Sequence, residues 1–150
     1  MNGPDFIPVS EAVVSLGHAG SRSATSRAYY AAFHITLKLL DDFQCVLPHR
    51  SKHDDPITCL SYATHQTGKS AGVVLGNLQG CRVKADYHFE ELAADDQDYG
   101  QYSIKQAKKV DSLIKEFRAT CASSPELKAK FCGDVQAYIK RKYPHAAKIK

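Results

Sequence analysis

The feature that most constrains the fold is a long run of apolar residues at helical spacing between residues 23 and 43. Positions three and four residues apart along this run form one core-facing series, Tyr29, Ala32, Phe33, Thr36, Leu37 and Leu40. Further apolar side chains extend this surface around the helix cylinder, at Tyr30, Ala31 and Ile35. A helix that is apolar on most sides must be covered by other elements. This segment is therefore predicted to be the central helix of its domain.

Weaker helical patterns occupy much of the remaining chain. They lie at about residues 10–16, 56–65, 70–86, 101–118 and 123–143. The first is expected to end at Gly17 and Gly20, and the third to follow a break at Gly68. No segment of useful length alternates between apolar and polar residues as a strand would. Because 150 residues with 43% hydrophobic composition suffice for one core, the sequence predicts a single all-α domain over residues 1–150.

Three glycines recur every four residues on one face of the helix predicted near residues 70–86. They are Gly72, Gly76 and Gly80. Each costs about 0.8–1 kcal/mol relative to alanine in an exposed helix interior. We expect close approach of a neighbouring helix to compensate for that cost.

Acidic residues mark two of the connections between helices. Asp55 and Pro56 are expected to supply the N-cap and the first position of the helix that begins near residue 56. Residues 86–98 carry six acidic side chains and no basic one. This second segment is predicted to be a mobile acidic loop.

The positive charge of the chain is concentrated near its C-terminal end. The formal net charge is +4, yet residues 128–150 carry seven Lys or Arg residues against the single acid Asp134. A basic helix over residues 123–143 can attract a phosphate backbone, which makes Lys140, Arg141 and Lys142 candidate phosphate contacts. A solvated, lysine-rich helix end is the alternative interpretation.

The cysteines and the hydropathy pattern restrict the cellular setting. The five cysteines are odd in number, widely spaced and never form a C-x-x-C pair, which disfavours a disulfide framework and a thiolate zinc site. No apolar run approaches membrane-spanning length, and the N-terminus lacks the pattern of a signal peptide. We expect reduced thiols, a cytoplasmic location, and no membrane association.

Two segments carry motifs that can be compared with a known family. Residues 26–34 read S-R-A-Y-Y-A-A-F-H, and residues 82–87 read R-V-K-A-D-Y. Together they resemble the S-R-A-Y-Y-A-x-F-H helix and the R-x-x-A-D-Y element of the HEPN family of small helical domains. His53, just before a predicted helix, lies where a branch of that family carries a histidine. The resemblance covers roughly residues 20–118.

This resemblance implies both a fold and a class of function. The implied fold is an up-and-down helical bundle of four to five helices over the core at about 20–118, here with an extra C-terminal helix. HEPN domains often form homodimers, and many are metal-independent endoribonucleases of toxin–antitoxin or phage-defence systems. Others are binding modules or inactive partners.

The resemblance also implies a catalytic pair, Arg82 and His88, whose spacing fits the R-x(4–6)-H motif of active members. His88 would take the proton from a ribose 2′-hydroxyl or protonate the leaving 5′-oxygen, while Arg82 would stabilise the phosphorane on the way to a 2′,3′-cyclic phosphate. Arg27, His34 and Lys84 would contact phosphate. On an ideal helix six positions turn two side chains about 120° apart. Cooperation therefore requires the helix to end near residues 85–87, or a second protomer to complete the site.

Each of these residues also has a purely structural interpretation. Arg82 can form an i,i+4 ion pair with Asp86, and His88 can be an ordinary solvent-exposed histidine. Arg27 and His34, two turns apart on one helix face, can line a groove. No metal site is predicted, because the acids that follow His53 are better explained as helix caps.

Two hypotheses about function follow from the sequence. The first is an RNA-cleaving homodimer of the HEPN type that needs no cofactor. The second is a non-catalytic HEPN module that binds a nucleotide or a partner protein, such as an antitoxin or a nucleotidyltransferase. Cleavage of RNA by the purified protein separates the two.

Overall fold

Six α-helices and two short 3-10 helices account for most of the residues that this computed structural model describes, which are 2–50 and 52–146. In chain order they are η1 (Gly3–Asp5), α1 (Phe6–Val13), α2 (Gly17–Asp42), α3 (Asp54–Ser61), α4 (Gln66–Tyr87), η2 (Leu92–Asp95), α5 (Gln97–Ser123) and α6 (Pro125–Lys142). Over the described ranges there is no β-strand. The all-α prediction is therefore confirmed.

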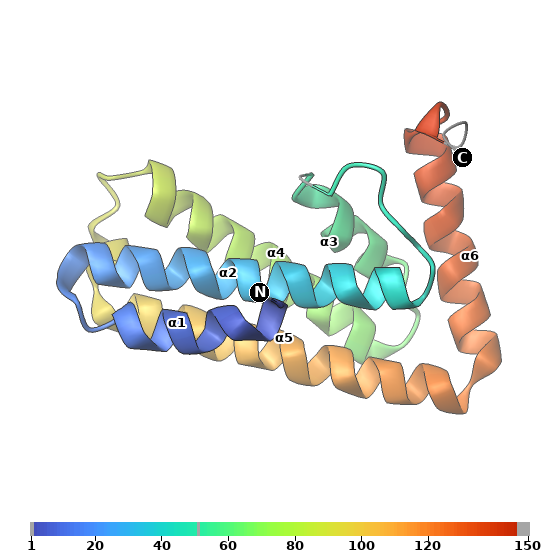
Figure 1. Cartoon of the computed structure of the whole chain (residues 1–150), viewed down its shortest axis with the longest axis horizontal. Helices are drawn as coiled ribbons and strands as arrows, with labels where there is room; N and C mark the ends of the chain where they lie inside the picture. The colour runs from blue at the N-terminus through green and yellow to red at the C-terminus, as the bar shows by residue number, and fades with distance from the viewer. Residues whose placement is uncertain (1, 51, 147–150) are drawn as a thin grey trace.

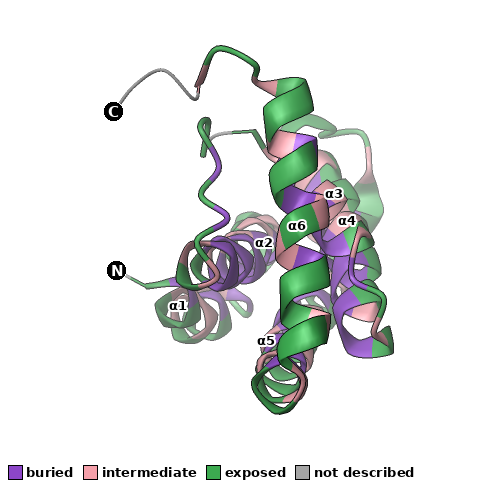
Figure 2. Cartoon of the chain, turned by 90° about the vertical axis from the view of Figure 1, so that its right-hand side faces the viewer, coloured by how far each residue is buried: buried purple, intermediate pink, exposed green. Residues whose placement is uncertain are grey.

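The four helices α1, α2, α4 and α5 lie side by side, and the chain reverses direction from each to the next (Figure 1). The short helix α3 packs on α4, and α6 stands across one end of the bundle (Figures 1 and 2). The coarser prediction, an all-helical bundle with an additional C-terminal helix, is therefore confirmed, although α1 lies outside the core that the resemblance implied at about 20–118. Helix α2 contacts α1, α4 and α5, so it occupies the centre.

Helix α2 is buried along almost its whole length, as its apolar surface required. Its fully buried side chains include Ala24, Ala28, Tyr29, Ala31, Ala32, Leu39 and Leu40. The helix starts earlier than expected, because Gly17 adopts a left-handed φ of 72° at the turn from α1. Gly20 does not end a helix either. A Cβ atom on Gly20 would lie 2.3 Å from the carbonyl oxygen of Val13, so this glycine allows α1 and α2 to approach closely.

The glycines of α4 differ from one another in what surrounds them. Gly68 lies inside α4 rather than before it. A Cβ atom at this position would lie 2.5 Å from the Cβ atom of Ala63, so a larger residue would clash there. At Gly72 an added Cβ would lie 3.0 Å from the Leu60 side chain of α3, which is the close approach that the spacing predicted. Gly76 has only an ordinary contact at 3.8 Å, and Gly80 faces open space. The expectation of close packing is therefore wrong for Gly80.

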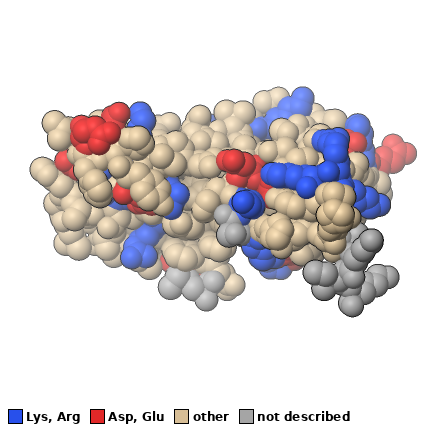
Figure 3. All heavy atoms as spheres, turned by 90° about the horizontal axis from the view of Figure 1, so that it is seen from above, with Lys and Arg blue, Asp and Glu red and all other residues tan. Residues whose placement is uncertain are grey.

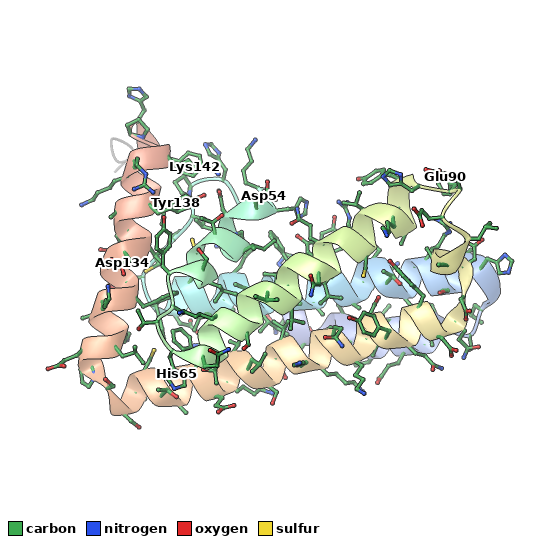
Figure 4. All side chains as sticks on the ribbon, turned by 180° about the vertical axis from the view of Figure 1, so that it is seen from behind. Asp54, His65, Glu90, Asp134, Tyr138 and Lys142 are labelled. Atoms are coloured by element: carbon green, nitrogen blue, oxygen red, sulfur yellow. The ribbon has the colours of Figure 1, made fainter. Side chains whose placement is uncertain are left out.

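Helix α6 is fastened to the bundle by an apolar contact and a polar one. Phe131 packs edge-on against Phe43 and Phe117, with ring centroids 6.2 Å and 5.2 Å apart. Nearer the C-terminal end, α6 meets Asp55 of α3, whose side chain is completely buried. Figure 4 shows Tyr138, one of its partners, on the side of α6 that faces α3.

Asp55 is surrounded by donors rather than capping a helix. The Tyr138 hydroxyl donates a hydrogen bond of 2.7 Å to its carboxylate, and the Tyr143 hydroxyl and the Lys142 ammonium donate to it as well. Burial alone would raise the pKa of Asp55, but these hydrogen bonds outweigh that effect and hold its pKa below the ordinary value. The predicted N-cap role is wrong, since α3 begins at Asp54. The carboxylate instead binds the end of α6.

Replacing glycine by alanine should have opposite effects at the two ends of the α4 glycine series. Gly80→Ala should raise the free energy of unfolding by about 0.5–1 kcal/mol, because a methyl group there meets nothing and reduces the freedom of the unfolded chain. Gly72→Ala should lower that free energy, because the methyl group crowds Leu60. Urea denaturation measures both changes. A destabilising Gly80→Ala would contradict the open surface seen at this position.

The Asp55 contacts should make the stability of the protein depend on pH. Because the folded-state pKa of Asp55 is lowered, its contribution is present above the unfolded pKa and is lost as pH falls through the folded one. Asp55→Asn should lower the free energy of unfolding at pH 7 by about 1–3 kcal/mol. The difference from wild type should shrink as the pH is lowered to 3. Urea denaturation at the two pH values tests this, and a difference that stays constant would contradict it.

Candidate functional site

The C-terminal end of α4 is held by the guanidinium of Arg22, which reaches across from α2. The last carbonyl groups of a helix lack partners within it. Here Arg22 donates hydrogen bonds to a ring of such carbonyls at the end of α4 and beyond it, those of Lys84, Ala85, His88, Phe89 and Glu91. Its Nε atom also pairs with the carboxylate of Asp95. The side chain of Arg22 is only 11% exposed.

This arginine orders the segment that the sequence predicted to be a mobile acidic loop. Residues 92–95 form η2, and the start of α5 is capped by Asp96, whose side chain accepts a hydrogen bond from the backbone N–H of Asp98 at 3.0 Å. The prediction of a loose loop is therefore wrong. Arg22 is a residue that the sequence analysis missed. The signal that could have indicated it is an arginine just before the first motif and an acidic segment at residues 86–98 that needs basic partners.

A hollow of about 430 Å³ lies between α2 and the C-terminal end of α4. This volume falls within the range of small-molecule sites in proteins. Its lining combines basic, acidic and aromatic side chains, which are Phe6, Arg22, Arg27, Tyr30, Asp86 and Phe89. Phe89 is 72% exposed at the edge of the hollow, and the guanidinium carbon of Arg22 lies 5.4 Å from its ring centroid.

The two motifs of the family resemblance meet at this hollow. Ser26 and Arg27 come from the first motif, and Asp86 comes from the second. The Ser26 hydroxyl donates a 3.2 Å hydrogen bond to Asp86. Arg27 is exposed and has no ion-pair partner within the part of the chain that the structure describes, unlike Arg22. Arg27 is therefore the basic side chain of the hollow that can meet an anion.

Arg82 lies directly behind the hollow, between two tyrosine rings. Its guanidinium carbon is 5.6 Å from the Tyr30 ring centroid and 5.0 Å from that of Tyr87. Its Nη2 atom donates hydrogen bonds to both hydroxyls, at 3.2 Å and 3.0 Å. Its Nε atom lies 2.7 Å from the Asp86 carboxylate, in an ion pair rather than an aligned hydrogen bond. The i,i+4 pair with Asp86 is thus present, and the Arg82 side chain is only 12% exposed.

His88 follows α4 immediately, and its side chain contacts Glu90. Helix α4 ends at Tyr87. It therefore ends near residues 85–87, as cooperation between Arg82 and His88 within one chain requires. The His88 side chain is 48% exposed, and its Nδ1 atom lies 3.1 Å from a carboxylate oxygen of Glu90. Among the described residues no hydrogen bond joins Arg82 to His88.

A different imidazole, that of His53, shares the environment of Arg82. Its Nδ1 atom lies 2.7 Å from the Tyr29 hydroxyl, and its ring centroid is 6.0 Å from that of Tyr30. Burial and the positive charge of Arg82 lower the pKa of His53 below its ordinary value, against a weaker opposite effect of Asp54. The imidazole is therefore neutral near pH 7. Burial also raises the pKa of the Tyr29 hydroxyl.

The remaining predicted contacts are spread over the molecule. The His34 ring stacks on Phe6 with centroids 5.7 Å apart, and it lines a separate hollow of about 420 Å³ with Arg50 and Arg118. Burial, together with the charge of Arg50, lowers the pKa of His34. Lys84 is exposed on α4, and its backbone carbonyl is among those bound by Arg22.

The basic residues of α6 lie at the opposite end of the molecule from the Arg27 hollow. Figure 3 shows Lys and Arg side chains gathered at the end where α6 stands. Lys142 is paired with Asp55, and Arg141 donates a 3.1 Å hydrogen bond to the Tyr62 hydroxyl. Lys140 is exposed. The structure thus brings Arg27 and Arg82 together but leaves the three α6 residues far from them.

The described residues contain no group of three or more His, Cys, Asp or Glu side chains arranged to hold a metal ion. None of the described helices combines the length and hydrophobicity that crossing a membrane would require. Comparison of the chain with models of protein families, with curated proteins and with solved structures finds no match. The likeness to HEPN domains therefore rests on the two sequence motifs alone.

Proposed function

We propose that this protein is a HEPN-like module that binds RNA by enclosing one nucleotide in the hollow between α2 and α4. The observation that carries the proposal is the meeting of both motifs at that hollow, with Arg27, Asp86 and three aromatic rings around one space. Arg27 has no ion-pair partner among the described residues, so it can bind a phosphate without breaking an internal ion pair.

The other side chains of the hollow suit the remaining parts of a ribonucleotide. The exposed ring of Phe89 and the partly buried ring of Tyr30 offer faces on which a base can stack. The carboxylate of Asp86 already accepts a hydrogen bond from Ser26, and it can accept one from a ribose 2′-hydroxyl. An acid in this place would repel additional phosphates. The hollow therefore fits a single nucleotide of a strand better than a polyphosphate.

Binding of a short fluorescein-labelled single-stranded RNA, followed by fluorescence anisotropy, tests this proposal. Arg27→Ala should weaken binding about tenfold, which corresponds to about 1.4 kcal/mol. The control variant Lys109→Ala also removes one exposed positive charge, on α5 and outside the hollow, and should change the affinity less than about twofold. DNA of the same sequence should bind more weakly, since it lacks the 2′-hydroxyl. Equal effects of the two variants would overturn the proposal.

Metal-independent cleavage of the bound RNA is the second candidate function, and the end of α4 at Tyr87 is what favours it. Because His88 lies beyond the helix, its side chain is not fixed at the ideal-helix angle from Arg82. In the reaction the ribose 2′-oxygen would attack phosphorus while the bond to the 5′-oxygen breaks, leaving a 2′,3′-cyclic phosphate. His88 would transfer the proton, and Arg82 would exchange Asp86 for the phosphate. A homodimer with facing sites belongs to this candidate.

Incubation of total cellular RNA with the purified protein in a chelator tests cleavage. The expected products end in a 2′,3′-cyclic phosphate, and His88→Ala should reduce the cleavage rate at least about 100-fold. His53→Ala is the informative comparison, because His53 shares the environment of Arg82 while His88 does not. Loss of cleavage only in the His53 variant would move the catalytic imidazole to residue 53. Absence of cleavage alongside RNA binding would leave the protein a binding module.

A further inference from the structure

Two thiols from distant parts of the sequence converge on one backbone oxygen beneath α6. The Cys45 thiol, just after α2, donates to the carbonyl oxygen of Phe43 with an Sγ–O distance of 3.6 Å. The Cys132 thiol of α6 donates to the same oxygen at 3.7 Å. The Cys45 sulfur also lies 3.9 Å from the backbone oxygen of Cys132, although the two residues are 87 positions apart. The two sulfur atoms are therefore close neighbours.

We infer that Cys45 and Cys132 form a reversible disulfide that fastens α6 to the bundle. Both side chains contact the Phe43 carbonyl oxygen, so a bond between them would join α6 directly to the segment that follows α2. Cys132 is partly exposed, whereas Cys45 is almost completely buried. The other cysteines near α6, Cys59 and Cys121, are both buried, so only Cys132 in this group is open to a reagent from solution.

The reaction requires an oxidant, which is a low-molecular-weight disulfide such as oxidised glutathione. The Cys132 thiolate attacks one sulfur of that disulfide, forms a mixed disulfide and releases one thiol. Cys45 then loses its proton and attacks the Cys132 sulfur, which forms the internal bond and releases the second thiol. The two protein thiols thus lose two electrons and two protons in all, and the glutathione disulfide is reduced to two thiols.

The surroundings of the two sulfurs set the order of these steps. Burial and the neighbouring Cys132 thiol raise the pKa of Cys45 to about 12, so Cys45 is almost entirely protonated near neutral pH. Because the thiolate is the nucleophile, Cys45 is poorly suited to react first. Its attack becomes favourable once the Cys132 sulfur has been activated beside it. Closure of the internal bond should therefore accelerate as the pH is raised.

The Cys45–Cys132 disulfide would affect α6, which has few buried side chains to hold it against the bundle. Only Phe131, Val135 and Tyr138 of α6 are buried, and its side-chain hydrogen bonds to the bundle include those to Asp55 and the one from Arg141 to the Tyr62 hydroxyl. A helix with so small a buried face can open without unfolding the bundle. A covalent link at Cys132, next to Phe131, would suppress that opening.

Treatment of the folded full-length chain with oxidised glutathione, followed by alkylation and peptide mapping by mass spectrometry, tests the inference. The expected product is a linked pair of peptides containing Cys45 and Cys132, with the other three cysteines alkylated and the link reversed by dithiothreitol. Hydrogen exchange of the α6 amides should slow at least about tenfold in the oxidised form. A Cys121–Cys132 link, or a mixed disulfide that stays on Cys132, would overturn the inference.

Two variants separate the internal bond from other oxidation. Cys45→Ala should leave glutathione attached to Cys132 and should abolish the linked peptides. Cys121→Ala removes another buried thiol beneath α6 and should leave the link intact. The peptide map of the wild-type chain decides the question even where a variant fails to fold. RNA binding through the Arg27 hollow at the other end is independent of this result.

Discussion

The structure depends on the burial of α2 on nearly all sides. A helix with apolar side chains around most of its cylinder is stable in water only when neighbours cover it, and α1, α4 and α5 together do so. Alanines at positions such as Ala24, Ala28 and Ala32 keep these neighbours close. Arg27 is exposed on α2, and the Arg27 hollow is one of the places where the cover of this helix is incomplete.

Arg22 holds the end of α4, which forms the other wall of that hollow. By binding the last carbonyl groups of α4 and the carboxylate of Asp95, it joins the end of α4 to η2. Asp86 lies in the last turn of α4, and Phe89 follows it, so both are positioned by this one guanidinium. An arginine is suited to this task, since its fork of donors can serve several acceptors at once.

Periodicity predicted the features that are local in the chain. The central helix, the all-α class and the helix after Ser124 all follow from spacing and capping residues, and the structure contains each of them. Arg22 and Asp55 act through partners far away in the sequence, such as the Ala85 carbonyl and the Tyr138 hydroxyl, and Gly20 acts through the Val13 carbonyl of the neighbouring helix. No local pattern encodes those pairings, which is why they were misread or missed.

The residues of the candidate site also divide into those that local sequence motifs identify and those that only tertiary contacts reveal. The two motifs identified Arg27 and Arg82 as candidate site residues and Asp86 only as an ion-pair partner of Arg82; in the structure Arg27 and Asp86 line the hollow, and Arg82 pairs with Asp86. The catalytic role of His88 stays a prediction, because its side chain contacts Glu90 rather than Arg82. His53 was noted only for its position before a helix. Its link to Arg82 arises from the packing of α3 against α4, which is a tertiary contact.

The two ends of the molecule differ in the charges that they could offer to a nucleic acid. Seven basic residues between 128 and 150 suggest a strongly attractive end, yet Lys142 is paired with Asp55 and Lys130 with Asp134. The other basic side chains at this end would attract the phosphate backbone of a nucleic acid without making sequence-specific contacts to its bases. The hollow contributes one cation without an ion-pair partner among the described residues, one carboxylate that accepts a hydrogen bond from Ser26, and three aromatic rings. Under the proposed RNA-binding function, recognition would therefore fall to the end of α4 and attraction to α6.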